Sequence, residues 1–139
     1  MRKCLVVLIF ASFWLAARSQ GPDEQALQDA RSCQSNLKTL AMACELYGTD
    51  WACYPPRLRH LTLKGLSGGY LKSIPTCPAA GADTYSATYH QRMSKFDKKG
   101  RYVAGVDHFR LCCGGHHHQA ANYGPDRPAY DAKRGLMVR

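Results

Sequence analysis

The sequence lacks the residue patterns of the common enzyme classes. Its ten acidic residues are scattered singly, apart from Asp23-Glu24, so no carboxylate pair is placed for general acid and base catalysis. No glycine-rich phosphate-binding loop follows a predicted strand. A cysteine nucleophile with His60 or His90 as its base is conceivable, but no catalytic signature surrounds any cysteine. We therefore expect a non-enzymatic protein that needs no cofactor.

The chain also lacks an apolar run long enough to span a membrane. The run from Cys4 to Ala17 has about 14 residues, whereas a membrane-spanning helix needs about 20. Two basic residues precede this run, and Ala17 and Ser19 place small side chains three and one positions before a cleavage point. This pattern predicts a secretory signal peptide over 1–19 and a secreted protein, extracellular or periplasmic, with no stable membrane span. An uncleaved anchor is the alternative.

Acidic residues are few relative to basic ones, 10 against 19, which gives a formal net charge of +9. Aromatic residues alternate with the densest basic patch, so this face could bind nucleic acid or an acidic polysaccharide through phosphate contacts and stacking. A solvated hairpin is the simpler interpretation, and salt-dependent retention on DNA would distinguish the two. The residues of the patch are Arg92, Lys95, Lys98, Lys99 and Arg101.

One long amphipathic helix is predicted over about residues 23–48. Pro22 and the two acids that follow it suit a first helical turn, and apolar residues then recur at steps of three and four. Gly48 is the expected end of the helix. The side chains expected on its buried stripe include Leu37, Leu40 and Tyr47.

The rest of the chain has only short stretches of regular apolar repeat. A loop rich in proline and glycine is expected over 49–83, a small sheet over 84–113 and a C-terminal loop over 114–139. The expected fold is therefore α+β, a single domain over 20–139 in which the long helix packs on three to four antiparallel strands. The strands are expected at 84–90, 101–106 and 108–113.

An even number of cysteines remains beyond the leader, once Cys4 is set aside. In a small exported domain this number favours disulfides over free thiols. Cys33 and Cys44 lie on one face of the predicted helix about 16 Å apart, so they cannot pair with each other. Each must reach another part of the chain, and the domain is expected to be stapled by disulfides.

Spacing suggests two of the disulfides. Cys44 and Cys53 bracket the helix end, so their pairing would close the following turn. Cys113 shares the apolar face of the last predicted strand, and the loop that carries Cys77 can lie beside it. The full connectivity stays open, because the last pair follows only by elimination. The two cysteines left over are Cys33 and Cys112.

A run of histidines follows two of the cysteines. Imidazole and thiolate both bind zinc or copper, and Gly114-Gly115 would let Cys112 and Cys113 converge with His116–His118. Three consecutive side chains in a loop rarely face one metal, so a surface run is the simpler interpretation. We expect no structural metal site and retain only His116 and His118 as weak metal contacts; a metal-binding or thiol-active protein is an alternative function.

Several short motifs occur in a particular order. They are Asn36-Leu37-Lys38, Tyr47 with Asp50, Tyr54-Pro55-Pro56, Tyr70-Leu71-Lys72-Ser73-Ile74-Pro75 and Cys77-Pro78. This ordered set resembles the head domains of type IV pilins and type II secretion system pseudopilins, over roughly residues 36–115. The resemblance implies a pilin-like fold and a structural or interaction role at the cell surface or outside the cell. Its partners would be other surface or pilus-like proteins.

The chain departs from that family at its N-terminus. No glycine precedes an aromatic residue in the leader, and the mature helix starts with the polar residues Pro22-Asp23-Glu24-Gln25. The long apolar segment by which pilins anchor and polymerise is therefore missing. The resemblance implies an exported pilin-like head, and it leaves assembly into a filament open.

The leader makes a first testable prediction. The exported protein should begin at Gln20, because Ala17 and Ser19 place the small side chains that signal cleavage requires. Intact-mass measurement and N-terminal sequencing of the exported protein check this result. Ala17→Arg should leave the leader attached, whereas wild-type protein that retains residues 1–19 would show an uncleaved anchor.

Overall fold

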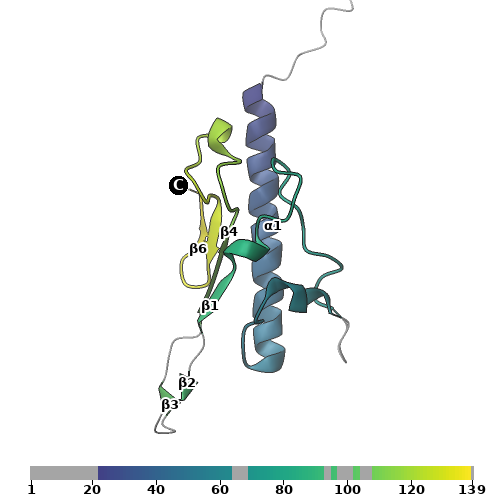
Figure 1. Cartoon of the computed structure of the whole chain (residues 1–139), viewed down its shortest axis with the longest axis vertical. Coiled ribbons are helices and arrows are strands. Elements are labelled where there is room, and N and C mark those ends of the chain that lie inside the picture. The colour runs from purple at the N-terminus through teal and green to yellow at the C-terminus, as the bar shows by residue number, and fades with distance from the viewer. Residues whose placement is uncertain (1–21, 64–68, 93–94, 97–101, 104–107, 139) are drawn as a thin grey trace, which may run out of the picture.

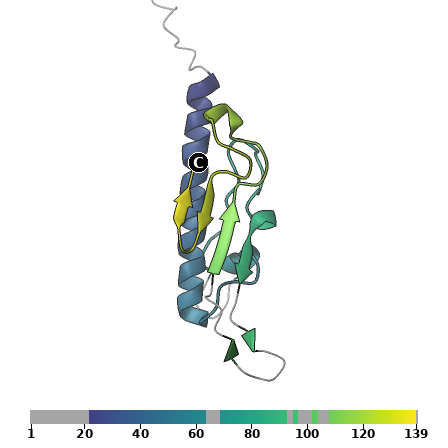
Figure 2. The ribbon, with the colours of Figure 1, turned by 90° about the vertical axis from the view of Figure 1, so that its left-hand side faces the viewer.

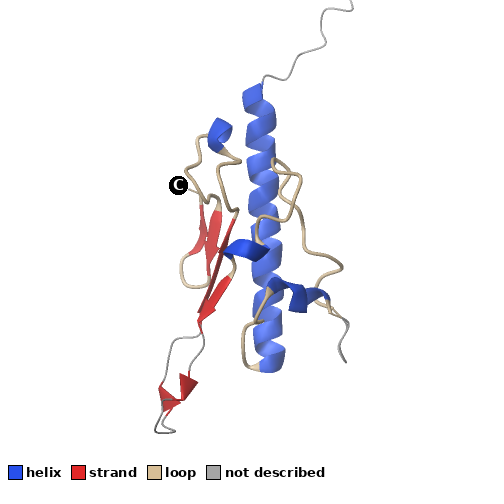
Figure 3. Ribbon diagram, viewed as in Figure 1, coloured by secondary structure: helices blue, strands red, loops and turns tan. Residues whose placement is uncertain are grey.

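The computed structural model describes residues 22–63, 69–92, 95–96, 102–103 and 108–138. One long helix stands beside a four-stranded antiparallel sheet, so the fold is α+β as predicted (Figure 1). Loops and short 3-10 turns lie along the helix where the strands do not reach, and the N-terminal turns of the helix stand clear of them (Figure 3). The predicted leader at 1–19 lies outside the described residues. Within the described ranges, no helix is both long and apolar enough to cross a membrane.

Helix α1 (Pro22–Trp51) has 30 residues and confirms the predicted long helix. It continues past Gly48, so the predicted end is wrong. A Cβ atom at Gly48 would lie 3.2 Å from the ring of Tyr54, so this glycine allows the close approach of the returning chain. The helix ends instead where Ala52 adopts a left-handed backbone conformation with a φ of 53°.

The sheet has the strand order β1-β4-β5-β6, with every neighbouring pair antiparallel (Figure 2). The pair β4 and β5 is central, and Leu111 of β4 stands opposite Tyr130 of β5. Helix α1 contacts β5 and β6. The strands are β1 (His90–Arg92), β4 (His108–Cys112), β5 (Ala129–Asp131) and β6 (Gly135–Met137).

The hairpin β5–β6 corrects the prediction of a C-terminal loop over 114–139. Its turn depends on Asp131, whose carboxylate accepts the backbone N–H groups of Lys133 at 3.0 Å and Arg134 at 3.2 Å. Gly135 then takes a positive φ of 74°, which a glycine adopts without a steric penalty. Two strands of three residues each give too short an alternation to be recognised by period.

The predicted strand at 84–90 is wrong for most of its length. The carboxylate of Asp83 accepts the N–H groups of Tyr85 at 2.9 Å and Ser86 at 3.0 Å, which bends the backbone into the 3-10 turn η2 (Ser86–Thr88). Thr88 then ties this turn to the sheet, because its hydroxyl donates to the carbonyl of Cys112 at 2.6 Å.

The predicted strand at 101–106 lies largely outside the described residues. Its described part is β3 (Tyr102–Val103), which pairs with β2 (Lys95–Phe96) in a separate two-stranded ribbon. The predicted strand at 108–113 is confirmed as β4, one residue shorter.

The core lies between α1 and the sheet. Phe109 is at its centre, with the Tyr54 ring edge-on at 4.7 Å and the Tyr130 ring stacked at 5.9 Å between centroids. The 3-10 turn η1 (Leu58–Thr62) closes the core from the side. Leucines from three elements complete it, and these fully buried residues are Leu37, Leu40, Leu58, Leu61 and Leu111.

The core makes a prediction about stability. Leu37 is fully buried under η1 and the sheet, so Leu37→Ala should lower the free energy of unfolding by about 2–5 kcal/mol. Met42 lies on the same helix and is 66% exposed, so Met42→Ala should change stability by no more than about 0.5 kcal/mol. Urea denaturation followed by circular dichroism measures both changes. Equal losses for the two variants would contradict the described packing.

Candidate functional site

Three cysteines and a histidine meet in the part of the core that lies toward the N-terminal half of α1. Cys33 comes from α1, Cys77 from an isolated bridge with Ala82, Cys113 from the residue after β4, and His118 from the residue before η3 (Gln119–Ala121). All four side chains are buried, and their ligand atoms lie within 4.8 Å of one another. We call these four residues the Cys3His cluster.

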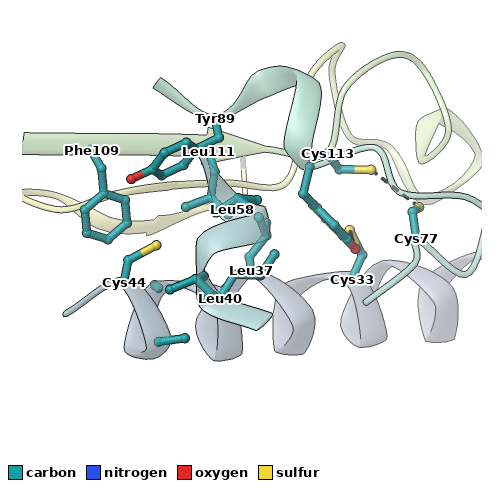
Figure 4. Close-up of a cluster of buried hydrophobic side chains, with 14 residues drawn as sticks. Cys33, Leu37, Leu40, Cys44, Leu58, Cys77, Tyr89, Phe109, Leu111 and Cys113 are labelled. Carbon is teal, nitrogen blue, oxygen red and sulfur yellow. Dashed lines mark hydrogen bonds between the residues drawn. The ribbon is translucent and has the colours of Figure 1, made fainter. Parts of the chain in front are cut away.

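The distances within the Cys3His cluster are short. The sulfur of Cys77 lies 3.4 Å from the sulfur of Cys113 and 3.4 Å from Nε2 of His118. Cys113 and Cys77 face each other above α1, and Cys33 projects toward them from the helix (Figure 4). The ring of His118 is held edge-on to Tyr123, with 6.3 Å between centroids.

A tight turn presents the sulfur of Cys77. The N–H of Cys77 donates to the carbonyl of Ala82 at 2.8 Å, and the N–H of Gly81 donates back to the carbonyl of Cys77 at 2.8 Å. Gly81 takes a positive φ of 64°, which favours glycine at this corner. The backbone N–H groups of Ala80 and Ala79 bond to the Cys77 side chain and favour its thiolate. Burial opposes them more strongly, so the pKa of Cys77 is raised.

A second turn brings His118 back to Cys113. A Cβ atom at Gly114 would lie 2.8 Å from the methyl group of Thr88, so only glycine fits there without a shift. Gly115 has a φ of 95°, and its N–H donates to the carboxylate of Asp126 at 2.8 Å. The two glycines reverse the chain directly after β4, and this reversal returns His118 to the core.

The hydroxyl of Tyr85 is the hydrogen-bond partner of the Cys33 sulfur, and Asn36 orients that hydroxyl. The side-chain amide of Asn36 donates to the carbonyl of Thr76 at 2.9 Å and to the hydroxyl of Tyr85 at 3.3 Å. Because the Tyr85 oxygen accepts this bond, its own proton is available to the Cys33 sulfur, 3.1 Å away. Tyr85 is fully buried, so the contact is shielded from water.

The three thiols of the Cys3His cluster differ in the direction in which their pKa is shifted. The hydrogen bond between Cys33 and Cys113 lowers the pKa of Cys113 and raises that of Cys33. Burial works against the charged form of both groups. The neighbouring side chains of Thr84, at 3.2 Å, and Cys77, at 3.4 Å, also lower the pKa of Cys113. Cys113 is therefore the thiol of this group that ionises most readily.

The predicted disulfides are not supported. All six cysteines of the described ranges are free thiols. Cys77 and Cys113 do come together as predicted, but their sulfurs are 3.4 Å apart, and a disulfide needs about 2.05 Å. Cys44 and Cys53 do not pair, because the helix continues beyond Gly48 and keeps Cys44 turned into the core.

The remaining cysteines lie apart from the Cys3His cluster. Cys44 is at the other end of the core, beside Phe109 (Figure 4). Burial raises its pKa to about 12, in spite of a hydrogen bond with Tyr89. Cys112 is buried but is not part of the main core cluster, and its backbone bonds to Thr88. The pair Cys33–Cys112, left by elimination, is therefore not formed.

The histidine run divides in the structure. His116 and His117 are exposed, and the ring of His116 contacts the side-chain amide of Gln119 at 3.0 Å. His118 is buried, so the interpretation of the run as a surface feature is wrong for this residue. The spacing of Cys113 and His118 on either side of two glycines was the available signal. The other two ligands come from distant segments, which sequence spacing could not bring together.

The predicted polyanion-binding patch is only partly described. Arg92 is exposed at the end of β1, and Lys95 lies in β2. Lys98, Lys99 and Arg101 lie outside the described residues, so this patch stays a prediction.

The burial of the thiols makes a prediction about reactivity. In the reduced native protein, iodoacetamide should modify Cys53 first, because it is the most exposed of the six cysteines. Peptide mass spectrometry over a time course measures the order, with denatured protein as the control in which all sites react. Modification of Cys33 or Cys77 at the rate of Cys53 would contradict the described burial.

Comparisons with known proteins do not add a family to this description. No protein-family description, no curated protein and no solved structure matches the chain.

Proposed function

We propose that the protein is an exported, non-enzymatic, pilin-like module that binds or assembles with other components at the cell surface or outside the cell. The observation that carries this proposal is the arrangement of α1. One 30-residue helix is packed along an antiparallel sheet, and two of the motifs of the resemblance to pilins, those that begin at Tyr54 and Tyr70, dock on its C-terminal half. The predicted leader supplies the route of export.

The first of these motifs, Tyr54-Pro55-Pro56, turns the chain back along the helix. The hydroxyl of Tyr54 donates to Glu45 at 3.2 Å. Pro55 is buried, and its carbonyl accepts the hydroxyl proton of Tyr89 at 2.8 Å. This motif therefore joins the end of α1 to the strand side of the core, as expected of a structural element.

The second motif, Tyr70 to Pro75, returns to the same end of the helix. The hydroxyl of Tyr70 donates to Asp50 at 2.7 Å and accepts the indole N–H of Trp51 at 3.1 Å. Its ring lies 5.5 Å from that of Tyr47. The paired residues Tyr47 and Asp50, which the resemblance singled out, thus have a common partner in Tyr70.

The outer side of α1 offers a surface for a protein partner. Met42 and Leu46 lie one helical turn apart and are 66% and 56% exposed. Each is a large apolar side chain whose contact area would be buried by another protein surface. This pair supports an interaction role for the helix, in addition to its role in the core.

Fractionation of the cells that make the protein tests the proposal. Wild-type protein should be found outside the cytoplasm and should sediment with the cell envelope. Replacing Met42 and Leu46 with glutamate should raise the ratio of soluble exported protein to envelope-bound protein about tenfold, because two charges would oppose burial of the helix surface. Quantitative immunoblotting of the fractions measures the change.

Two controls accompany this experiment. Ser73→Glu with Ala87→Glu adds the same charge at exposed positions away from the outer face of α1 and should leave the distribution unchanged. Circular dichroism should show the same fold for all variants. Cytoplasmic wild-type protein, or equal partitioning of both double variants, would contradict the proposal. Salt-sensitive retention on DNA, lost on neutralising Lys98, Lys99 and Arg101, would favour the nucleic-acid alternative instead.

A further inference from the structure

The geometry points to a structural zinc site: Cys33, Cys77, Cys113 and His118 bind one Zn²⁺ ion as its four ligands. This inference reverses the expectation of no metal site, and it does not depend on the proposed pilin-like role. It also gives a reason why three cysteines and a buried histidine from separate parts of the chain converge on one point.

The donor set fits zinc in both type and number. Structural zinc sites in proteins are tetrahedral and are commonly built from three cysteines and one histidine, with Zn–S near 2.3 Å and Zn–N near 2.0–2.1 Å. Tetrahedral angles then place two sulfurs about 3.8 Å apart, and a sulfur and a nitrogen about 3.6 Å apart. The Cys77–Cys113 and Cys77–His118 distances are both 3.4 Å, so small side-chain rotations suffice to admit the ion.

Hydrogen-bond donors lie close to the sulfurs and could stabilise thiolates bound to a metal. The hydroxyl of Tyr85 is free to donate to Cys33, the hydroxyl of Thr84 lies 3.2 Å from Cys113, and backbone N–H groups point at Cys77. Three thiolates and a neutral imidazole around Zn²⁺ carry a net charge of −1. Donors aimed at the sulfurs stabilise such a charge, as the groups around metal ligands generally do.

The histidine presents one nitrogen to the cluster. Nε2 of His118 faces Cys77, whereas Nδ1 is buried and has no hydrogen-bond partner among the described residues. Nε2 is therefore the ring atom available as a ligand. All four ligands come from the protein and are buried, which leaves no open position for a substrate and indicates a structural ion.

The site would join four segments that no strand pairing connects to one another. Cys33 belongs to α1, Cys77 to the proline-rich loop, Cys113 to the end of the central strand, and His118 to the loop before η3. Cys77 and Cys113 are 36 residues apart, and Cys77 and His118 are 41 apart. A single ion would therefore close long loops, and its binding energy would add to folding stability.

A disulfide between Cys77 and Cys113 is the competing state. It would remove two electrons and two protons from the pair of thiols, and so it requires an oxidant. It would also take away two of the four ligands, so one molecule cannot contain both cross-links. The disulfide gives no reason for Cys33 and His118 to lie beside Cys77 and Cys113, whereas the zinc site uses all four residues.

Metal analysis of the full chain tests the inference directly. The protein is isolated from the cells that make it, without added metal or reductant. Inductively coupled plasma mass spectrometry should then find one zinc per chain. Addition of Co²⁺ to the reduced, metal-free protein should give the intense visible bands of a tetrahedral site and the ultraviolet thiolate-to-cobalt charge-transfer band. Excess Zn²⁺ should abolish both signals.

Substitutions identify the ligands. Cys33→Ser, Cys77→Ser, Cys113→Ser and His118→Ala should each lower zinc affinity by at least 100-fold, measured by competition with a coloured chelator. Cys44→Ser, Cys53→Ser and Cys112→Ser remove a thiol elsewhere and should retain one zinc. Because a ligand variant can fail to fold, Tyr85→Phe provides a milder test. It keeps the ring but removes the donor to Cys33, so it should weaken binding about 10–100-fold.

Two results would overturn the inference. One is reduced wild-type protein that binds no zinc and gives no tetrahedral cobalt spectrum. The other is a Cys77–Cys113 disulfide in metal-free protein isolated from its cells, mapped by non-reducing peptide mass spectrometry. Neither result depends on where the protein is located or what it binds, so failure of the zinc site and failure of the proposed function are distinguishable.

Discussion

Burial of one face of α1 is the constraint on which the rest of the structure depends. A helix gains little stability from its own backbone hydrogen bonds in water, so 30 helical residues need tertiary cover along their length. The strands supply this cover only in part, since β5 and β6 have three residues each. Loops and 3-10 turns must supply the remainder, and they need specific contacts to hold them against the helix.

Those contacts differ along the helix. Toward the C-terminal end, aromatic rings and leucines around Phe109 provide a large apolar area. Toward the N-terminal end the core contains fewer large apolar side chains, because Cys33, Cys77 and Cys113 lie there with Tyr85 and His118. Small side chains bury less apolar surface, and a short chain has little core to spare. A cross-link between the loops and α1 is therefore most useful in this second region.

The sequence predicted the elements in which a regular apolar repeat is sustained over several residues. The apolar repeat of α1 and the alternation in β4 were sufficient, because each reflects a local backbone geometry. The hairpin β5–β6 and the turn at 84–88 were missed, because Asp131 and Asp83 set the backbone there by accepting N–H groups. Single side chains of this kind override the pattern of the residues around them.

The site was harder to predict, for a related reason. Sequence spacing correctly brought Cys77 and Cys113 together and predicted a disulfide, which their free thiols do not support. It did not bring Cys33 and His118 to the same point, because they join the pair only through the folded chain. A Cys77–Cys113 disulfide and a metal ion would each tie the loop that carries Cys77 to the end of β4. Of these two, only the proposed ion would use all four side chains of the Cys3His cluster. The hydrogen bond from Asn36 to Tyr85 leaves the tyrosine proton available to Cys33, where it would stabilise a metal-bound thiolate.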